Sequence, residues 1–231
     1  DLATGTELKA ICSRGDLAGA LATVSRGLST RGTVQVLGGI LLRAEEGKLL
    51  LAATDMEISL RATIGGTIEG DGAVVVPGKL LTDLARLLPD ESVTLAHEEG
   101  EGVLTVTSGN HTSRLNVFSV EDFPRLPALD GELHATDAPA LLATIDKVSR
   151  AASRDESRPV LTGILVQFSG GKLVMAATDS YRLAVKETDL DAGGAEIEAI
   201  IPARALQELA RLAAGGDEVK TPRHGCKPDA G

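Results

Sequence analysis

Hydrophobic and polar residues alternate over several short stretches of the chain, a pattern typical of strands with one buried face. Residues 7–10 and 132–135 each read polar, apolar, polar, apolar. Longer apolar runs at residues 40–42 and 49–52 lie on either side of Glu46-Gly47, and glycine at that spacing favours a tight turn. The pattern therefore predicts a first strand at each of the two positions and a hairpin within the first third of the chain.

The hairpin sequence occurs twice. Residues 39–60 read GILLRAEEGKLLLAATDMEISL and residues 163–184 read GILVQFSGGKLVMAATDSYRLA, with ten identical positions and no gap. Matching aspartates upstream and proline-led segments downstream keep nearly the same separation, from 121 residues (Asp16 and Asp137) to 125 (Pro77 and Pro202). A fixed period indicates a duplicated structural unit. The alternative, two unrelated α+β segments of similar composition, does not explain three matching blocks in the same order.

Each repeat predicts the order strand, helix, strands, helix, strands. Asp16 and Asp137 stand where helix N-caps belong, and Pro139 suits the first turn of the second of these helices. Buried-strand runs at residues 74–76 and 200–201 each end at a proline that precedes another helix. Three further strands are expected in the first repeat, at residues 92–96, 102–107 and 113–118. The predicted fold class is therefore α+β, with two helices in each repeat packed on antiparallel sheets.

The four predicted helices each have an apolar stripe and a basic face, as positions advance by 100° per residue. The stripes are Leu17, Ala20, Leu21, Val24 and Leu28; Leu80, Leu81, Leu84, Leu87 and Leu88; Leu141, Ile145, Val148 and Ala152; and Ala205, Leu206, Leu209 and Leu212. The basic residues opposite them, with Arg31 at the end of the first helix, are Arg26, Arg31, Lys79, Arg86, Lys147, Arg150, Arg154, Arg204 and Arg211.

This charge is segregated. The helical segments hold nine basic residues against only Asp83, Asp146 and Glu208, a surplus of six, whereas the whole chain has a net charge of −10. Lys and Arg are also good helix formers that solvate exposed faces, which is the simpler explanation. We favour a second explanation, in which the basic faces contact the phosphates of a polyanion. Aromatic residues are only 2% of the chain, so duplex DNA fits better than a single strand bound by base stacking.

The repeat and three segments resemble one known family. GGILLRAEEGKLLLAATDMEISL, EDFPRLP and LTGILV…AATDSYRLAV are similar to the bacterial sliding clamp, the beta subunit of the replicative DNA polymerase III, and the match extends to about Glu218. The resemblance implies repeated sliding-clamp domains that form a six-domain ring around duplex DNA, with helices lining the hole. It also implies a non-catalytic processivity factor without cofactor that acts in the cytoplasm at the nucleoid. The implied partners are the replicative polymerase, the clamp loader and repair proteins, which bind through short hydrophobic motifs.

The resemblance assigns candidate sites. It places Arg31 near the DNA and adds the segment SRAASRDESRPVL, which nominates Arg150, Arg154 and Arg158. The family's Thr-Asp-x-x-Arg-Leu stretch is matched by Thr178, Asp179, Arg182 and Leu183, and it implies one wall of a partner-peptide cleft. Ser180 and Tyr181 lie between the matched residues. In the family, a third domain supplies the other wall.

The resemblance also sets expected boundaries. Residues 1–8 lead into the first strand, residues 9–130 form the first domain, and residues 131–219 form a second domain without its final strands. Residues 220–231 are rich in proline, glycine and polar residues, do not resemble a clamp, and are expected to be disordered. On this interpretation the chain is a fragment of a family whose full-length members are homo-oligomers, and closure of a ring by this chain is doubtful.

Other function classes find little support in the sequence. It contains no GxxxxGK[ST], GxSxG, HExxH or CxxC motif, so neither an enzyme nor a metal site is expected. The matched positions of Asp55 and Asp179 suggest a repeated turn rather than a catalytic pair. Two cysteines cannot form a disulfide framework, which favours a reducing compartment. No apolar run has the length that a membrane span needs. The remaining alternative is a protein-interaction scaffold built from two α+β repeats that does not bind DNA.

Overall fold

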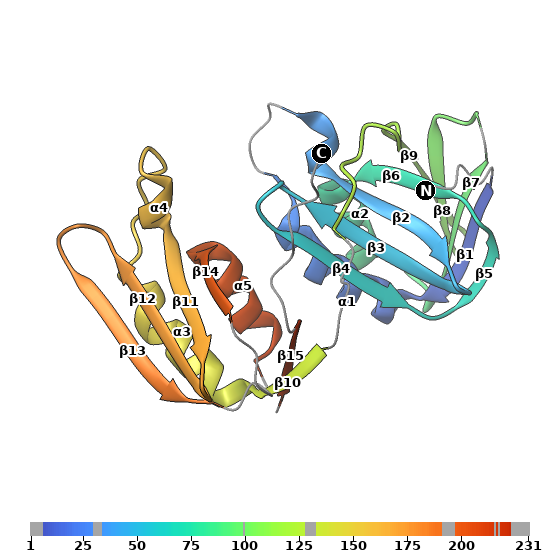
Figure 1. The fold of residues 1–231 in the computed structure, drawn as a ribbon. Coiled ribbons are helices and arrows are strands. Elements are labelled where there is room, and N and C mark those ends of the chain that lie inside the picture. The colour runs from blue at the N-terminus through green and yellow to red at the C-terminus, as the bar shows by residue number, and fades with distance from the viewer. Residues whose placement is uncertain are drawn as a thin grey trace. The chain divides into compact units, whose positions relative to one another are not determined.

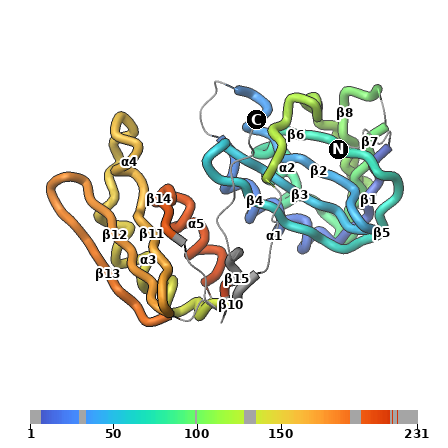
Figure 2. The backbone as a smooth tube through the Cα atoms, in the orientation of Figure 1, coloured from blue at the N-terminus to red at the C-terminus, as the bar shows by residue number. Residues whose placement is uncertain are grey.

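The computed structural model describes residues 7–29, 34–98, 100–127, 133–190, 197–214, 216 and 218–222 (Figures 1 and 2). The chain divides into two compact units, the first ending at Leu126 and the second beginning at Pro127. Each unit has its own hydrophobic core, so each is an independent α+β body.

The first unit contains nine strands and two α-helices among its described residues. In chain order they are β1 (Glu7–Ser13), α1 (Arg14–Val24), the 3-10 turns η1 (Ser25–Gly27) and η2 (Gln35–Gly38), β2 (Gly39–Glu45), β3 (Lys48–Thr54), β4 (Ser59–Ile64), β5 (Thr67–Gly70), β6 (Ala73–Pro77), α2 (Gly78–Leu87), β7 (Ser92–Glu98), β8 (Val103–Ser108) and β9 (His111–Asn116). The hairpin predicted around Glu46-Gly47 is confirmed as β2 and β3, with both turn residues at positive φ.

Two antiparallel sheets form the first unit, in the orders β5-β1-β7-β8-β9 and β4-β3-β2-β6. Alternation works as expected on β1, where Leu8, Ala10 and Cys12 are buried in the core and the residues between them, Lys9 and Ile11, are only partly buried. Helices α1 and α2 pack against each other, and their apolar faces join the same core (Figure 1). The sheets and the helix pair therefore bury one apolar volume, and the outward faces of the helices are exposed.

Two details of these helices differ from the sequence prediction. Ser13, and not Asp16, caps α1: its hydroxyl accepts a hydrogen bond from the Asp16 amide at 3.2 Å, which places Asp16 in the first turn. In α2 the core face consists of Gly78, Leu81, Thr82 and Ala85, continued by Leu88 after the helix. Leu80 and Leu87 lie about a quarter turn or more away from that face and are 57% and 81% exposed, so their assignment to the apolar stripe was wrong.

The second unit follows the same general order of strand, helix, strands, helix and strand, with fewer strands among its described residues. They are β10 (Leu133–Asp137), α3 (Ala138–Ser149), the single turn α4 (Pro159–Thr162), β11 (Gly163–Ser169), β12 (Lys172–Thr178), β13 (Leu183–Asp189), β14 (Ile197–Pro202), α5 (Ala203–Leu212) and β15 (Glu218–Pro222). The strands form sheets in the orders β13-β12-β11-β14 and β10-β15. Asp137 caps α3 as predicted, with its carboxylate accepting from the Ala140 amide at 2.7 Å.

Helices α3 and α5 pack together on one face of the four-stranded sheet (Figure 1). Their buried residues, including Leu141, Ile145 and Leu206, meet Ile164, Val166 and Leu173 from the sheet. Ile200 does not belong to this core. It is 55% exposed, because β14 turns it to the face of the sheet opposite the helices, so its prediction as a buried-strand residue was wrong.

The C-terminal segment also differs from expectation. β15 extends to Pro222 and pairs in antiparallel register with β10, with Val219 opposite Thr136 and Lys220 opposite Ala135. Val219 is 8% exposed and belongs to the core of the second unit. The predicted disordered tail therefore starts too early, because residues 220–222 continue a strand that pairs with β10. Residues 223–231 lie outside the described part of the chain.

Candidate nucleic-acid interface and partner cleft

The basic residues predicted for the helices of the first unit are exposed. Lys79 and Arg86 lie on the side of α2 away from the core. Arg26 follows α1 in the turn η1, and its side chain is not without an interaction partner. Arg31 lies outside the described residues. The exposed face of the α1–α2 pair is therefore basic at Lys79 and Arg86, with Asp83 as the acidic residue between them on α2.

In the second unit Lys147, Arg150, Arg204 and Arg211 lie on the exposed side of the α3–α5 pair. The placement of Arg154 on the face of the first of these helices was wrong, because α3 ends at Ser149 and Arg154 lies in the exposed segment beyond it. Two of these residues are neutralised locally. Arg150 Nη2 lies 2.9 Å from Asp146 Oδ1 one turn earlier, and this contact raises the pKa of Arg150 further above its ordinary value. Arg211 pairs with Glu208. The positive charge available to a ligand is therefore smaller than the count of basic residues indicates.

Glu208 is the unexpected residue of this surface. The sequence identified it only as an acidic residue of a helical segment, but it is 7% exposed and is buried along with Ala203 and Leu206 of α5. A carboxylate in such a place needs a cationic partner. Arg211 supplies one, so part of its role is structural.

Arg158 does not lie on a helix face. It precedes the turn α4, and its Nε contacts Asp155 Oδ2 at 3.1 Å while its Nη1 donates to Ser180 Oγ at 3.2 Å. Asp155 also accepts two hydrogen bonds from Ser157, the main reason why the pKa of Asp155 lies below its ordinary value. The structure thus connects Arg158, assigned to DNA from the sequence, with the turn assigned to the partner cleft.

That turn joins β12 to β13. Thr178 Oγ1 donates to the Arg182 carbonyl at 2.8 Å, and Asp179 Oδ1 accepts from the amides of Tyr181 and Arg182, both at 3.0 Å. The Tyr181 amide contributes most to lowering the pKa of Asp179, and the Arg182 guanidinium at 3.0 Å acts in the same direction. With its polar groups satisfied internally, the turn displays Tyr181 and Leu183, which are 93% and 69% exposed.

The first unit repeats this turn. Thr54 Oγ1 donates to the Ile58 carbonyl at 2.9 Å, and Asp55 Oδ1 accepts from the amides of Glu57 and Ile58. Met56 and Ser180 occupy equivalent positions, and both have positive φ. The two aspartates therefore hold a local turn in separate units, as the duplication suggested.

Sequence reasoning missed an apolar row beside the cleft turn. Across the four-stranded sheet of the second unit, Ile200 pairs with Leu165, Leu165 with Ala176, and Ala176 with Val185. Leu165, Val185 and Ile200 are 37%, 60% and 55% exposed. Period-two alternation would have identified Leu165, because it lies between the inward-facing Ile164 and Val166.

No group of three or more metal-binding side chains occurs in the residues that the structure describes. In the same part of the chain, no helix has both the length and the apolar character required to cross a bilayer.

Comparisons with known proteins identify both units. Residues 8–127 match the model of the N-terminal domain of the DNA polymerase III beta subunit, and residues 136–221 match that of its central domain. The beta sliding clamp of Streptomyces coelicolor is 36% identical over 92% of this chain and 56% of its own length. That of Micrococcus luteus is 36% identical over 91% of this chain and 68% of its own length.

Solved structures agree. The sliding clamp of Caulobacter crescentus superposes with a TM-score of 0.84 at 30% identity, covering 92% of this chain and 59% of that one. The clamp of Pseudomonas aeruginosa bound to griselimycin gives a TM-score of 0.81 at 30% identity, over 92% and 58%. This chain thus spans little more than half the length of most of these relatives. With both units matched in order, the chain belongs to the family of the DNA polymerase III beta subunit, the bacterial sliding clamps.

Proposed function

We propose that the chain functions as part of a non-catalytic DNA clamp, in which the exposed helix faces of both units contact duplex DNA in the bacterial cytoplasm, at the nucleoid. The observation that supports this proposal most is the position of Lys79, Arg86, Lys147 and Arg154. All four are exposed, three on helices and Arg154 in the segment that follows α3, in two family-matched units of a chain whose net charge is −10. None of them forms an ion pair with another described residue.

Flexible lysine and arginine side chains on a rigid helix suit this role. They contact phosphates, which recur along every DNA sequence, so the affinity they give is independent of sequence and falls with salt. Such contacts allow movement along the duplex while the protein stays bound. Arg26 and Arg204 extend the same faces, whereas the carboxylate partners of Arg150 and Arg211 reduce what those two residues contribute.

We further propose that the turn of Thr178, Ser180, Tyr181, Arg182 and Leu183 is a docking site for short hydrophobic motifs of polymerases and other partners. Exposed Tyr181 and Leu183 lie at the end of β12 and β13, the strands that carry part of the apolar row of Leu165, Val185 and Ile200. Two similar clamps, those of Pseudomonas aeruginosa and Bartonella birtlesii, have been solved with griselimycin bound. The same apolar row is what favours the second candidate function, a protein scaffold that does not use DNA.

Salt titration of DNA binding separates the two functions. We expect Lys79→Gln with Arg86→Gln to reduce the dependence of log affinity on log salt by up to about 1.8, since each lost phosphate contact removes about 0.9. The matched control, Lys48→Gln with Arg114→Gln, removes the same charge from strands β3 and β9. Fluorescence anisotropy with a labelled duplex measures both. Equal slopes for the two double variants, or an absence of binding at low salt, would exclude the helix face as the DNA contact.

A further inference from the structure

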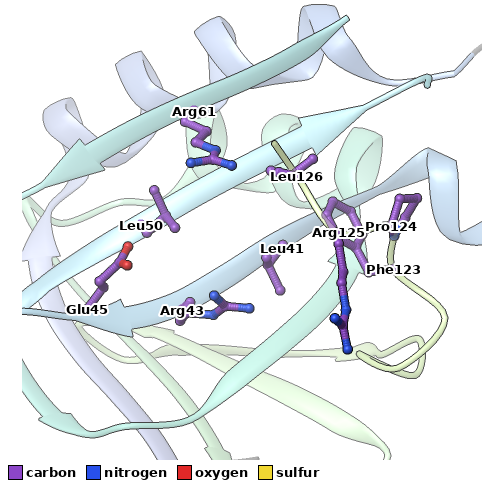
Figure 3. A pocket seen from close by; sticks show the side chains of 9 residues that line it. All are labelled: Leu41, Arg43, Glu45, Leu50, Arg61, Phe123, Pro124, Arg125 and Leu126. Carbon is purple, nitrogen blue, oxygen red and sulfur yellow. The ribbon is translucent and has the colours of Figure 1, made fainter. Parts of the chain in front are cut away.

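A groove on the first unit lies away from the α-helices. Its floor is the face of the sheet β4-β3-β2-β6 turned away from the main core, and one side is formed by residues 123–126 (Figure 3). The cavity has a volume of about 210 Å³. We call it the arginine groove, after Arg43, Arg61 and Arg125, which line it together with Leu41, Leu50 and Phe123.

The floor of the arginine groove is apolar and rigid. Leu41 and Phe123 are 3% and 4% exposed and belong to a small second core on this side of the sheet. The segment that carries Phe123 is tied to the sheet, because the Phe118 amide donates to the Val75 carbonyl at 2.8 Å. A ligand here would meet a preformed surface with room for one bulky side chain.

The charge of the groove is positive. Three arginines face one carboxylate, Glu45, in a protein that is acidic as a whole. Neither Arg43 nor Arg125 forms an ion pair with another residue in the described ranges. The Arg43 Nε is buried and has no hydrogen-bond acceptor, which is costly for a cationic donor. A ligand oxygen could reach this Nε only after the Arg43 side chain turned toward the groove, and a bound carboxylate would then supply the missing acceptor.

The second unit does not repeat the feature. The duplicated strand places Gln167 at the position of Arg43, and its amide donates to Glu198 at 3.3 Å. The sheet faces are otherwise alike, since Leu41 pairs with Ala52 as Leu165 pairs with Ala176. The unsatisfied arginine is thus specific to the first unit and is not a property of the repeated fold.

We propose that the arginine groove binds a short segment of a partner protein that presents a carboxylate beside one bulky aliphatic or aromatic side chain. Guanidinium groups suit carboxylates in geometry as well as in charge. Nucleic acid fits less well, because phosphates would leave the apolar floor uncovered and Phe123 is too buried to stack on a base. This site is separate from the helix faces and the cleft turn, and it does not depend on their proposed functions.

The test uses the whole chain and two blocked peptides, Ac-Ala-Glu-Leu-Glu-Ala-NH2 and its counterpart with glutamines. Nitrogen-detected NMR of arginine side chains follows the Nε–H of Arg43, which is assigned by its disappearance in Arg43→Gln. We expect the glutamate peptide to shift this signal in a saturable way and to bind at least about 5-fold more tightly than the glutamine peptide. Arg125→Gln should weaken the glutamate peptide by a similar factor, because each removes a charge-assisted contact.

Two controls make the result decisive. Arg114→Gln removes an exposed charge from β9 of the same unit and should leave the affinity unchanged. Leu183→Ala alters the cleft turn of the other unit and should also have no effect. Equal binding of both peptides, or equal weakening by Arg114→Gln and Arg125→Gln, would overturn the proposal. So would a duplex DNA or inorganic phosphate that shifts the Arg43 signal with the affinity of the glutamate peptide, because the groove would then be a general anion site.

Discussion

Replacing Arg211 by alanine tests whether a residue of the helix face proposed to contact DNA also stabilises the second unit. Its partner Glu208 has a side chain that is 9% exposed, whereas the side chain of Arg211 is 59% exposed. The substitution removes the guanidinium and leaves the carboxylate in its buried place. We therefore expect Arg211→Ala to destabilise the second unit, although the residue lies on the protein surface.

The size of the effect follows from the two exposures. Breaking a fully buried ion pair costs about 3–5 kcal/mol, because a charge is left without compensation. Glu208 retains a further interaction, and Arg211 is largely solvated, so the free energy of unfolding should fall by only about 1–2 kcal/mol. Replacing Glu208 by glutamine in the same chain should restore much of this loss, since a neutral amide is cheaper to bury.

Urea unfolding of the four variants in a double-mutant cycle gives the coupling energy, and hydrogen exchange of the α5 amides locates the change in the second unit. Arg150→Ala is the matched control. It breaks the pair with Asp146, whose two side chains are 74% and 66% exposed, and should cost no more than about 0.5 kcal/mol. If Arg211→Ala and Arg150→Ala had the same small effect, or if the cycle gave no coupling, Glu208 would not depend on Arg211.

Three further results are expected. Burial raises the pKa of the Cys12 thiol to about 11. In a Cys226→Ser background, its alkylation at pH 8 should therefore be about 100-fold slower than that of an ordinary thiol and should become fast on unfolding. Fast alkylation of the native protein would contradict this. The pKa of Asp179 in the folded protein is below its ordinary value of 3.8. The ionised carboxylate should therefore stabilise the turn fully above about pH 4, and this stabilisation should be lost as the pH falls through the pKa of the folded state. An NMR titration that gives a pKa of 3.8 or more would refute this. Leu42 is 0% exposed, so Leu42→Ala should lower the free energy of unfolding in urea by about 2–5 kcal/mol. Leu87 is 81% exposed, so Leu87→Ala should lower it by less than about 0.5 kcal/mol. Similar losses for the two variants would mean that Leu87 is packed in solution.

Local features of the fold were predictable because they depend on residues close together in sequence. The turn at Glu46-Gly47 and its copy at Gly170-Gly171 specify hairpins by their own conformational preferences, and the structure places each between paired strands. The cap of α3 by Asp137 is equally local. Leu80 and Leu87 were misassigned because leucine marks an apolar stripe only when a neighbouring element covers it, and helical periodicity does not show which elements do so.

The remaining features arise from contacts between residues far apart in sequence. The Arg158 contact with Ser180 spans 22 residues, and the pairing of β15 with β10 spans more than 80. The arginine groove requires the segment 123–126 to return to strands that precede it by some 70 residues. No periodicity or motif encodes these approaches. A sequence can therefore identify Arg43 as a strand residue, but it cannot show that its Nε is buried without an acceptor.

The local ion pairs limit the DNA binding that we propose for this chain. Arg150 and Arg211 are partly neutralised. Among the described residues, each unit then offers a few basic side chains without a carboxylate partner, chiefly Lys79 and Arg86 in one unit and Lys147 and Arg154 in the other. Two phosphate contacts per unit support only weak, strongly salt-dependent association. On this proposal, retention on DNA would come from joining several such units, because a second unit binds at the high effective concentration that its covalent link provides. Weak contacts repeated along a polymer also suit a protein that has to move, since no single contact holds it at one position.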